Sequence, residues 1–174
     1  INVTTALSCF QNCTALQKVP AGLFGATTKT KTLTSMFSGC SSLTDIAADA
    51  FSGIKATAGN MSSIFQNCTG LNIFVNPEKV RYINNLFQGC SALESVNVGI
   101  FDNFKALTSA TFTFDGCVAL TGESPYTEVN GVKYHLYERT AETTAITGFA
   151  YLKNLKAMFK GCTKLTDYDK IPDT

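Results

Sequence analysis

The sequence predicts an α/β solenoid in which about six similar segments each form one coil of a short strand and a short helix. Three observations support this prediction. A motif centred on a cysteine recurs six times, and a glycine or asparagine precedes that cysteine in every copy. The apolar residues before the cysteine have the spacing of one helix face. A coil of this size cannot bury its apolar side alone, so neighbouring copies have to pack on one another.

The copies align on one cysteine, and positions within a copy are counted from it. A phenylalanine stands at −3 and a leucine at +3 in all six copies. The cysteines are Cys13, Cys40, Cys68, Cys90, Cys117 and Cys162, and the phenylalanines are Phe10, Phe37, Phe65, Phe87, Phe114 and Phe159. By subtraction, successive cysteines are 27, 28, 22, 27 and 45 residues apart, so the last interval holds an insertion. We expect these cysteines and phenylalanines to form the structural core.

Each copy predicts a helix and then a strand. Apolar residues at −7, −4, −3 and 0 make one helix face. Position −1 is Asn12, Gly39, Asn67, Gly89, Gly116 or Gly161, and these two residue types enter the left-handed conformation that ends a helix. After the cysteine, "ALQKV" and "SLTDI" place apolar residues around two exposed ones, which predicts a strand. A second phenylalanine, eleven residues after the cysteine in three copies, anchors the segment beyond the strand; it is Phe24, Phe51 or Phe101.

The seven cysteines are best explained as core residues. A disulfide framework is disfavoured because the count is odd and because Cys9 and Cys13 lie one turn apart on a predicted helix. A zinc site needs closely paired cysteines, whereas six of these are spread one per copy. Cysteine is among the most buried residue types and behaves as a small apolar residue. The sequence therefore points to no metal and no cofactor.

Composition and charge restrict the function. The net charge of +1 does not suggest a nucleic-acid partner, and no apolar run is long enough to span a membrane. A cysteine or serine nucleophile would have to use the single histidine, His135, so the sequence predicts that the protein is not an enzyme. Glycosylation sequons at Asn2, Asn12, Asn60 and Asn67 are explained as by-products of the repeat.

Residues 121–147 interrupt the repeat. Asn130-Gly131 between two alternating stretches predicts a β-hairpin. Its second strand has Val132, Tyr134 and Leu136 on one side and Lys133, His135, Tyr137 and Arg139 on the other. Either the first side packs on the solenoid and the second is displayed, or the reverse; the side with Lys133, His135, Tyr137 and Arg139 is a candidate binding surface. The alternative, that the hairpin covers the end of the stack, is favoured because every solenoid needs such a cap. A second candidate surface is the outward strand face, with Gln17, Lys18, Thr44, Asp45, Asn72, Ile73, Glu94 and Ser95.

The units "MFSGCSSL", "LFQGCSAL" and "MFKGCTKL", with "AFSG" between strand and helix, resemble the BspA-like leucine-rich-repeat surface proteins and the similar repeats of Bacteroides and mycoplasma lipoproteins. The likeness covers about residues 7–120 and 148–174. It implies a single right-handed leucine-rich-repeat domain over 1–174, with repeats in 1–120 and 148–174, located extracellularly or at the cell surface.

The resemblance also implies a function. We expect a non-enzymatic module for adhesion, with an unknown protein or carbohydrate at the cell surface as its partner. The alternative is a structural spacer, or stalk, of a larger surface protein. No signal peptide is visible, and both ends fall inside or just outside a copy, so we expect the chain to be a piece of a longer protein.

Overall fold

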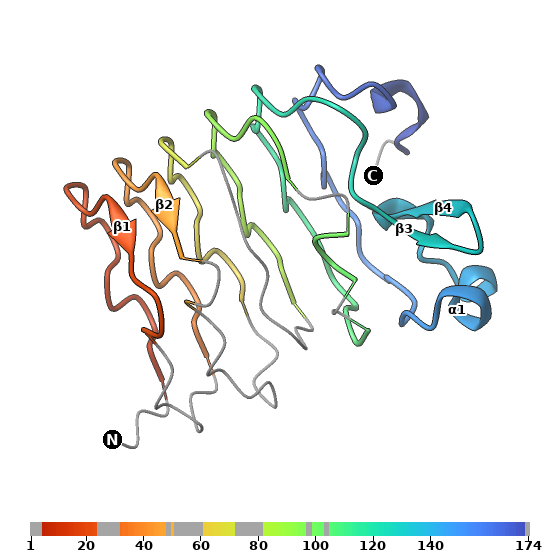
Figure 1. Cartoon of the computed structure of the whole chain (residues 1–174), viewed down its shortest axis with the longest axis horizontal. Helices are drawn as coiled ribbons and strands as arrows, with labels where there is room; N and C mark the ends of the chain where they lie inside the picture. Colours follow the sequence, from red (N-terminus) through yellow and green to blue (C-terminus); the bar gives the residue numbers. More distant parts are fainter. Residues whose placement is uncertain are drawn as a thin grey trace.

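The computed structural model describes residues 5–23, 32–47, 50, 61–71, 82–96, 99–102 and 105–172. Two short strands, β1 (Lys18–Val19) and β2 (Asp45–Ile46), pair in parallel. In the insertion, β3 (Tyr126–Val129) and β4 (Val132–His135) pair antiparallel and precede the α-helix α1 (Ala141–Thr147). Two 3₁₀-helices cover Leu136–Glu138 and Tyr168–Lys170. Figure 1 shows this order along the chain.

The predicted fold class is wrong. The structure is not an α/β solenoid of about six repeats built from short strands and short helices. Among the described residues there is one α-helix, which lies in the insertion, and there are two sheets of two strands each. Most of the remaining described residues lie in turns and loops. None of the copies forms its predicted helix in the described residues, and the predicted strands are reduced to two residues each in the first two copies.

A left-handed residue inside each predicted helix explains this error. Position −1 has a positive φ in all six copies, as the sequence predicts, but position −5 has one as well. The residues at −5 are Ser8, Ser35, Ser63, Asn85, Phe112 and Ala157, with φ between 50° and 59°. An isolated left-handed residue cannot continue a right-handed helix. The segment before each cysteine is therefore a series of turns.

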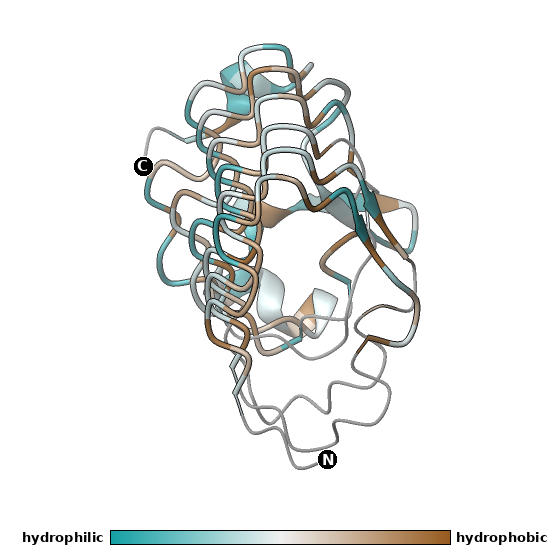
Figure 2. Cartoon of the chain, turned by 90° about the vertical axis from the view of Figure 1, so that its left-hand side faces the viewer, coloured by the Kyte–Doolittle hydropathy of each residue, from teal (hydrophilic) through white to brown (hydrophobic). Residues whose placement is uncertain are grey.

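Alternate backbone amides before each cysteine bond to the next copy and not within a helix. The N–H groups at −5, −3 and −1 donate to the carbonyls at −6, −4 and −2 of the following copy. Between the third and fourth copies, for example, Phe65 N donates to the Leu86 oxygen at 3.1 Å. The same three bonds recur at all five junctions. Figure 1 shows the segments lying side by side in chain order, and Figure 2 shows that they nearly superpose when viewed along the stack.

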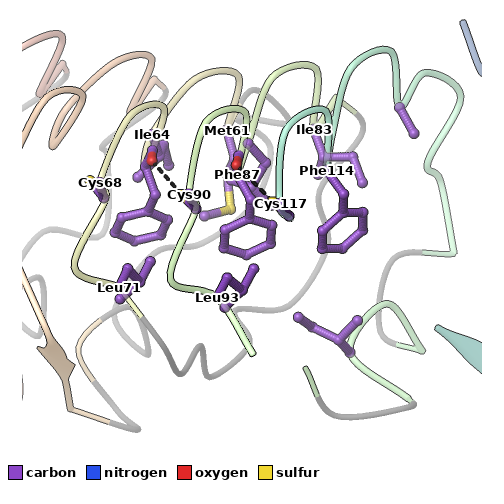
Figure 3. Packing of buried hydrophobic residues seen from close by; sticks show 14 of the residues in the cluster. Met61, Ile64, Cys68, Leu71, Ile83, Phe87, Cys90, Leu93, Phe114 and Cys117 are labelled. Carbon is purple, nitrogen blue, oxygen red and sulfur yellow. Dashed lines mark hydrogen bonds between the residues drawn. The ribbon is translucent and has the colours of Figure 1, made fainter. Parts of the chain in front are cut away.

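The side chains at −3 and 0 form two continuous columns in the core. Successive phenylalanine rings stack with centroids 5.1–6.1 Å apart. Each cysteine from the second copy onward donates its S–H to the phenylalanine carbonyl of the preceding copy, at 3.0–3.1 Å. Figure 3 shows two of these bonds, from Cys90 and Cys117. The core is therefore formed by contacts between neighbouring copies.

The first copy departs from this pattern. The other five phenylalanines and five cysteines of the columns are buried, as predicted. Phe10 is only half-buried, however, and Cys13 is exposed, so the prediction of Cys13 as a core residue is wrong. The Cys13 thiol is exposed because no described segment precedes the first copy and packs against it.

The hairpin lies where the sequence predicts it. Asn130 and Gly131 form its turn with φ of 52° and 79°, both in the left-handed region. The helix α1 follows, with Thr140 accepting a bond from Thr143 N at its start and Gly148 in the left-handed conformation at its end. Hairpin and helix lie at the end of the stacked segments opposite β1 (Figure 1).

Some predictions concern residues that the structure does not describe. Phe24, Phe51, Asn72, Ile73, Asn2 and Asn60 lie outside the described residues. Phe101, the remaining member of the second phenylalanine series, is buried at 2% exposure. Within the described part of the chain, no helix is both long enough and apolar enough to cross a membrane.

Candidate functional site

The strand face displays polar side chains in the copies where it is described. Gln17, Lys18, Thr44, Asp45, Glu94 and Ser95 are all exposed, as predicted. Lys18 and Asp45 are register partners in the β1–β2 pair, and their charged groups lie 2.7 Å apart. Because both side chains are more than half exposed, this ion pair contributes little to stability. These six residues are called the strand-face row below.

The hairpin does not present the predicted set of four side chains. Lys133 is exposed, His135 and Tyr137 are half-buried, and Arg139 is buried at 6% exposure. The alternation of a strand stops at His135, because the next three residues form a 3₁₀-helix. On the opposite side the pattern is also broken, since Val132 is exposed while Leu136 is buried.

Lys133 forms an ion pair and a cation–π contact at the hairpin surface. Its ammonium lies 2.5 Å from a Glu123 carboxylate oxygen and 4.6 Å from the centre of the Tyr126 ring. The bond to Glu123 raises the pKa of Lys133. The cation is therefore held beside an aromatic ring, and the Glu123 carboxylate compensates its charge.

His135 joins the hairpin to the C-terminal segment. Its Nδ1 lies 2.8 Å from the Ser124 hydroxyl and 3.3 Å from Asp167 Oδ2. Asp167 is buried and accepts two bonds from Ser124, one from the backbone N–H at 2.9 Å and one from the hydroxyl at 2.6 Å. Tyr137 stacks on the imidazole at 5.2 Å. Burial, together with Asp167 and Glu138 nearby, raises the pKa of Tyr137 to about 12.

This cluster has the residue types of a serine hydrolase but not the geometry. In a catalytic triad the serine and the carboxylate approach opposite nitrogens of the imidazole, so that a proton can pass from one side to the other. Here Ser124 and Asp167 approach the same nitrogen, Nδ1, and Ser124 is fully buried. The arrangement can hold the hairpin in place, but it cannot relay a proton from serine through histidine to aspartate.

Arg139 anchors the other side of the hairpin. It donates to the Phe101 carbonyl at 3.0 Å and lies 3.8 Å from the centre of the Phe149 ring. Lys105 lies 3.8 Å from the same ring. Burial lowers the pKa of Arg139 to about 10, with Asp102 opposing the shift, so the guanidinium is charged at neutral pH. Arg139 is thus a structural residue of this region.

The buried thiols are poor nucleophiles. Burial raises the pKa of Cys68 and of Cys162 to about 12, and it also raises the pKa of Cys40, Cys90 and Cys117. The reactive form of cysteine is the thiolate, which these environments disfavour. Among the described residues, no group of three or more histidines, cysteines, aspartates and glutamates could hold a metal ion.

Ser124 and Asp167 were not predicted from the sequence. Asp167 stands at +5, the same position as Lys18 and Asp45, which belong to the exposed strand face. In the sixth copy the insertion covers this position and buries the carboxylate. The one signal in the sequence was the single histidine in the insertion, whose ring nitrogens need hydrogen-bond partners when half-buried. That signal does not identify which residues are the partners.

Comparison of the chain with protein-family models, curated proteins and solved structures gives no match. The resemblance to BspA-like repeat proteins therefore stays a prediction.

Proposed function

We propose that this chain is a non-enzymatic module, secreted or displayed at the cell surface, that binds a protein or a glycan. The observation that carries the proposal is the strand-face row, because polar side chains are exposed at the same positions of the first, second and fourth copies. The backbone ladder and the two core columns beneath hold these positions in fixed register. A regular, rigid row of this kind suits a broad contact with a repetitive or extended partner.

The clamped Lys133 beside Tyr126 is a second contact point on the hairpin. Catalysis has less support, because Ser124 and Asp167 both contact the same nitrogen of the one described histidine, His135. The resemblance noted from the sequence is consistent with adhesion at a cell surface and supplies the proposed location.

The experiment is a binding screen followed by two charge exchanges. The chain is tested on arrays of matrix proteins and glycans, and each hit is measured by surface plasmon resonance. The double variant Lys18→Asp with Asp45→Lys reverses the charges of the strand-face row while keeping its ion pair. The matched variant Lys133→Glu with Glu123→Lys does the same on the hairpin.

A hit that loses at least tenfold in affinity with the first exchange, and not with the second, supports the strand-face row. A hit sensitive only to the second exchange moves the site to the hairpin and overturns the assignment to the row. Absence of any hit contradicts the binding function and favours the structural spacer.

A further inference from the structure

The turns before each cysteine carry a second polar surface, separate from the strand-face row. In the third to fifth copies the residues at −7, −4, −3 and 0 are buried, whereas those at −6, −5 and −2 are only half-buried. Position −8 adds the exposed Tyr82 and the half-buried Ser109. Asp115 is the only charged residue at these outer positions of the three copies. We call Gln66, Tyr82, Asn84, Asn85, Gln88 and Ser109 the amide face.

Hydrogen bonds between side chains fix the centre of the amide face. Gln88 Oε1 accepts from Gln66 Nε2 at 2.8 Å and from Asn85 Nδ2 at 2.6 Å. Gln88 Nε2 in turn donates to Asp115 Oδ2 at 2.8 Å. This chain of bonds runs from the third copy through the fourth to the fifth. Because the side chains are already ordered, a ligand that contacts them loses little affinity to ordering them.

Three atoms of these amides keep free hydrogen-bonding capacity. Gln66 Oε1, Asn85 Oδ1 and Asn84 Nδ2 have no partner among the described residues. The first two atoms are acceptors and the third is a donor. A sugar hydroxyl is both a donor and an acceptor, so it can bond to atoms of either kind. The one charge nearby, on Asp115, is negative and disfavours an anionic ligand.

Tyr82 supplies an aromatic surface beside the amides. It pairs with Ser109 in a parallel bridge, and the Ser109 hydroxyl donates to Asn84 Oδ1 at 2.7 Å. Tyr82 is 42% exposed. A tyrosine ring offers an apolar face and a hydroxyl, and the C–H side of a pyranose ring packs on such a face. The amide face therefore combines a contact for the apolar side of a sugar with several contacts for its hydroxyls.

The backbone ladder sets the spacing of the amide face. Asn67 N of the third copy donates to the Gln88 oxygen of the fourth at 2.7 Å, and Gly89 N of the fourth donates to the Asp115 oxygen of the fifth at 2.8 Å. Segments paired in this way lie about 4.8 Å apart. This spacing is close to the length of one pyranose unit in a linear chain. Successive units of such a chain can therefore contact successive copies.

We infer that the amide face binds a linear, uncharged glycan that lies across the third, fourth and fifth copies. The Tyr82 ring packs against the apolar side of one sugar unit. Gln66, Asn84 and Asn85 bond to hydroxyls of that unit and its neighbours. A protein partner fits less well, because a protein interface has an apolar centre, and Tyr82 is the only exposed large hydrophobic residue of this face. The inference rests on the proposed binding function and assigns it a class of glycan and a second surface.

The test is isothermal titration calorimetry with linear hexasaccharides of glucose, mannose, xylose and N-acetylglucosamine, and with a heparin hexasaccharide as the charged comparison. We expect the wild type to bind at least one of the uncharged chains, and to bind it at least tenfold more tightly than heparin. Tyr82→Ala removes the ring and is expected to weaken this binding at least tenfold. Gln66→Ala removes one amide and is expected to weaken it at least threefold. Tyr82→Phe keeps the ring and is expected to stay within about twofold of the wild type.

Tyr168→Ala is the matched control. Tyr168 is also an exposed tyrosine, but it lies in the 3₁₀-helix Tyr168–Lys170, outside the amide face. We expect this variant to bind the glycan as the wild type does. We expect the same of the double variant Lys18→Asp with Asp45→Lys, because the strand-face row does not take part in this contact.

The inference is overturned if no uncharged hexasaccharide binds; the proposed function then still stands if the arrays give a hit that depends on the Lys18–Asp45 exchange. It is also overturned if Tyr82→Ala, shown by urea unfolding to be folded, binds the glycan as well as Tyr168→Ala does. If Tyr82→Ala does not fold, Gln66→Ala decides in its place, and wild-type affinity of that variant refutes the inference. Glycan binding that is lost only with the Lys18–Asp45 exchange refutes it as well and leaves the strand-face row as the site.

Discussion

The first and fourth copies have nearly the same motif but different surroundings. Phe87 and Cys90 of the fourth copy are fully buried, with a copy on each side, whereas Phe10 is half-buried and Cys13 exposed. The Cys90 thiol donates to the Phe65 carbonyl of the preceding copy, and Cys13 has no described predecessor. The difference shows that burial and hydrogen bonding of these residues come from the neighbouring copy. This is expected where a copy cannot bury its apolar side chains alone and neighbouring copies pack on one another.

The largest effect of the buried thiols on stability is expected at alkaline pH. A thiol whose pKa is raised in the folded state stabilises the fold fully below its unfolded pKa of 9.0, and this contribution is lost as pH rises toward the folded value, about 12 for Cys68 and Cys162. Each such thiol lowers the free energy of unfolding by about 1.4 kcal/mol per pH unit in that window.

Denaturant unfolding between pH 8 and 11 measures this slope. Cys68→Ala is expected to reduce the slope by the contribution of one thiol, because burial raises the pKa of that thiol in the folded chain. Equal slopes for the wild type and Cys68→Ala would show that Cys68 ionises equally well in the folded chain.

Truncation of the phenylalanine column is expected to give the next largest difference. Phe87→Ala removes a ring stacked between Phe65 and Phe114 and should cost about 3–5 kcal/mol, because its neighbours cannot fill the cavity. Phe10→Ala removes a ring with one stacking partner and should cost about 1 kcal/mol. Urea unfolding compares the two, and equal losses would contradict the distinction between inner and outer copies.

Polar contacts join the hairpin to the sixth copy. Asp167→Ala leaves the buried Ser124 N–H and hydroxyl without their carboxylate and should cost about 1–3 kcal/mol. Asp169→Ala, at an exposed position two residues away, is the control and should change stability by less than about 0.5 kcal/mol. If thermal melting shows no difference between the two variants, Asp167 does not hold the hairpin.

Removing single thiols is expected to have the smallest effect. Cys90→Ala loses the packing of a buried sulfur and its bond to Phe65, which should cost about 1–2 kcal/mol. Cys13→Ala removes an exposed sulfur and should stay within about 0.5 kcal/mol of the wild type. A larger loss for Cys13→Ala than for Cys90→Ala, measured by urea unfolding, would reverse the comparison.

Much of the packing could be predicted from the sequence, but not the secondary structure. The recurrence of phenylalanine and cysteine identifies which residues are buried, because side-chain size and polarity repeat with them. Glycine and asparagine at −1 identify one left-handed position. The second left-handed position, −5, has Phe112 and Ala157 among its members, and these residues carry no such signal. Helical spacing therefore suggested a helix where the backbone bonds to the next copy.

The candidate site was harder to predict, because its contacts join distant segments. The hairpin turn is local and was predicted from Asn130-Gly131. The burial of Arg139 against Phe101 and Phe149, and that of Asp167 against Ser124, depends on how the insertion folds back. Alternation along a strand also fails after His135, where the chain enters a 3₁₀-helix, so the predicted display of four side chains on one face could not hold.

The central claim is that each cysteine from the second copy onward is buried by packing between neighbouring copies. Counting the thiols that react under native conditions tests this claim most directly. The reduced protein is treated with a maleimide reagent at neutral pH, and the labelled cysteines are identified by mass spectrometry. We expect Cys9 and Cys13 to react at once, and Cys40, Cys68, Cys90, Cys117 and Cys162 to react only after denaturant is added. Rapid native labelling of any of these five would contradict the account.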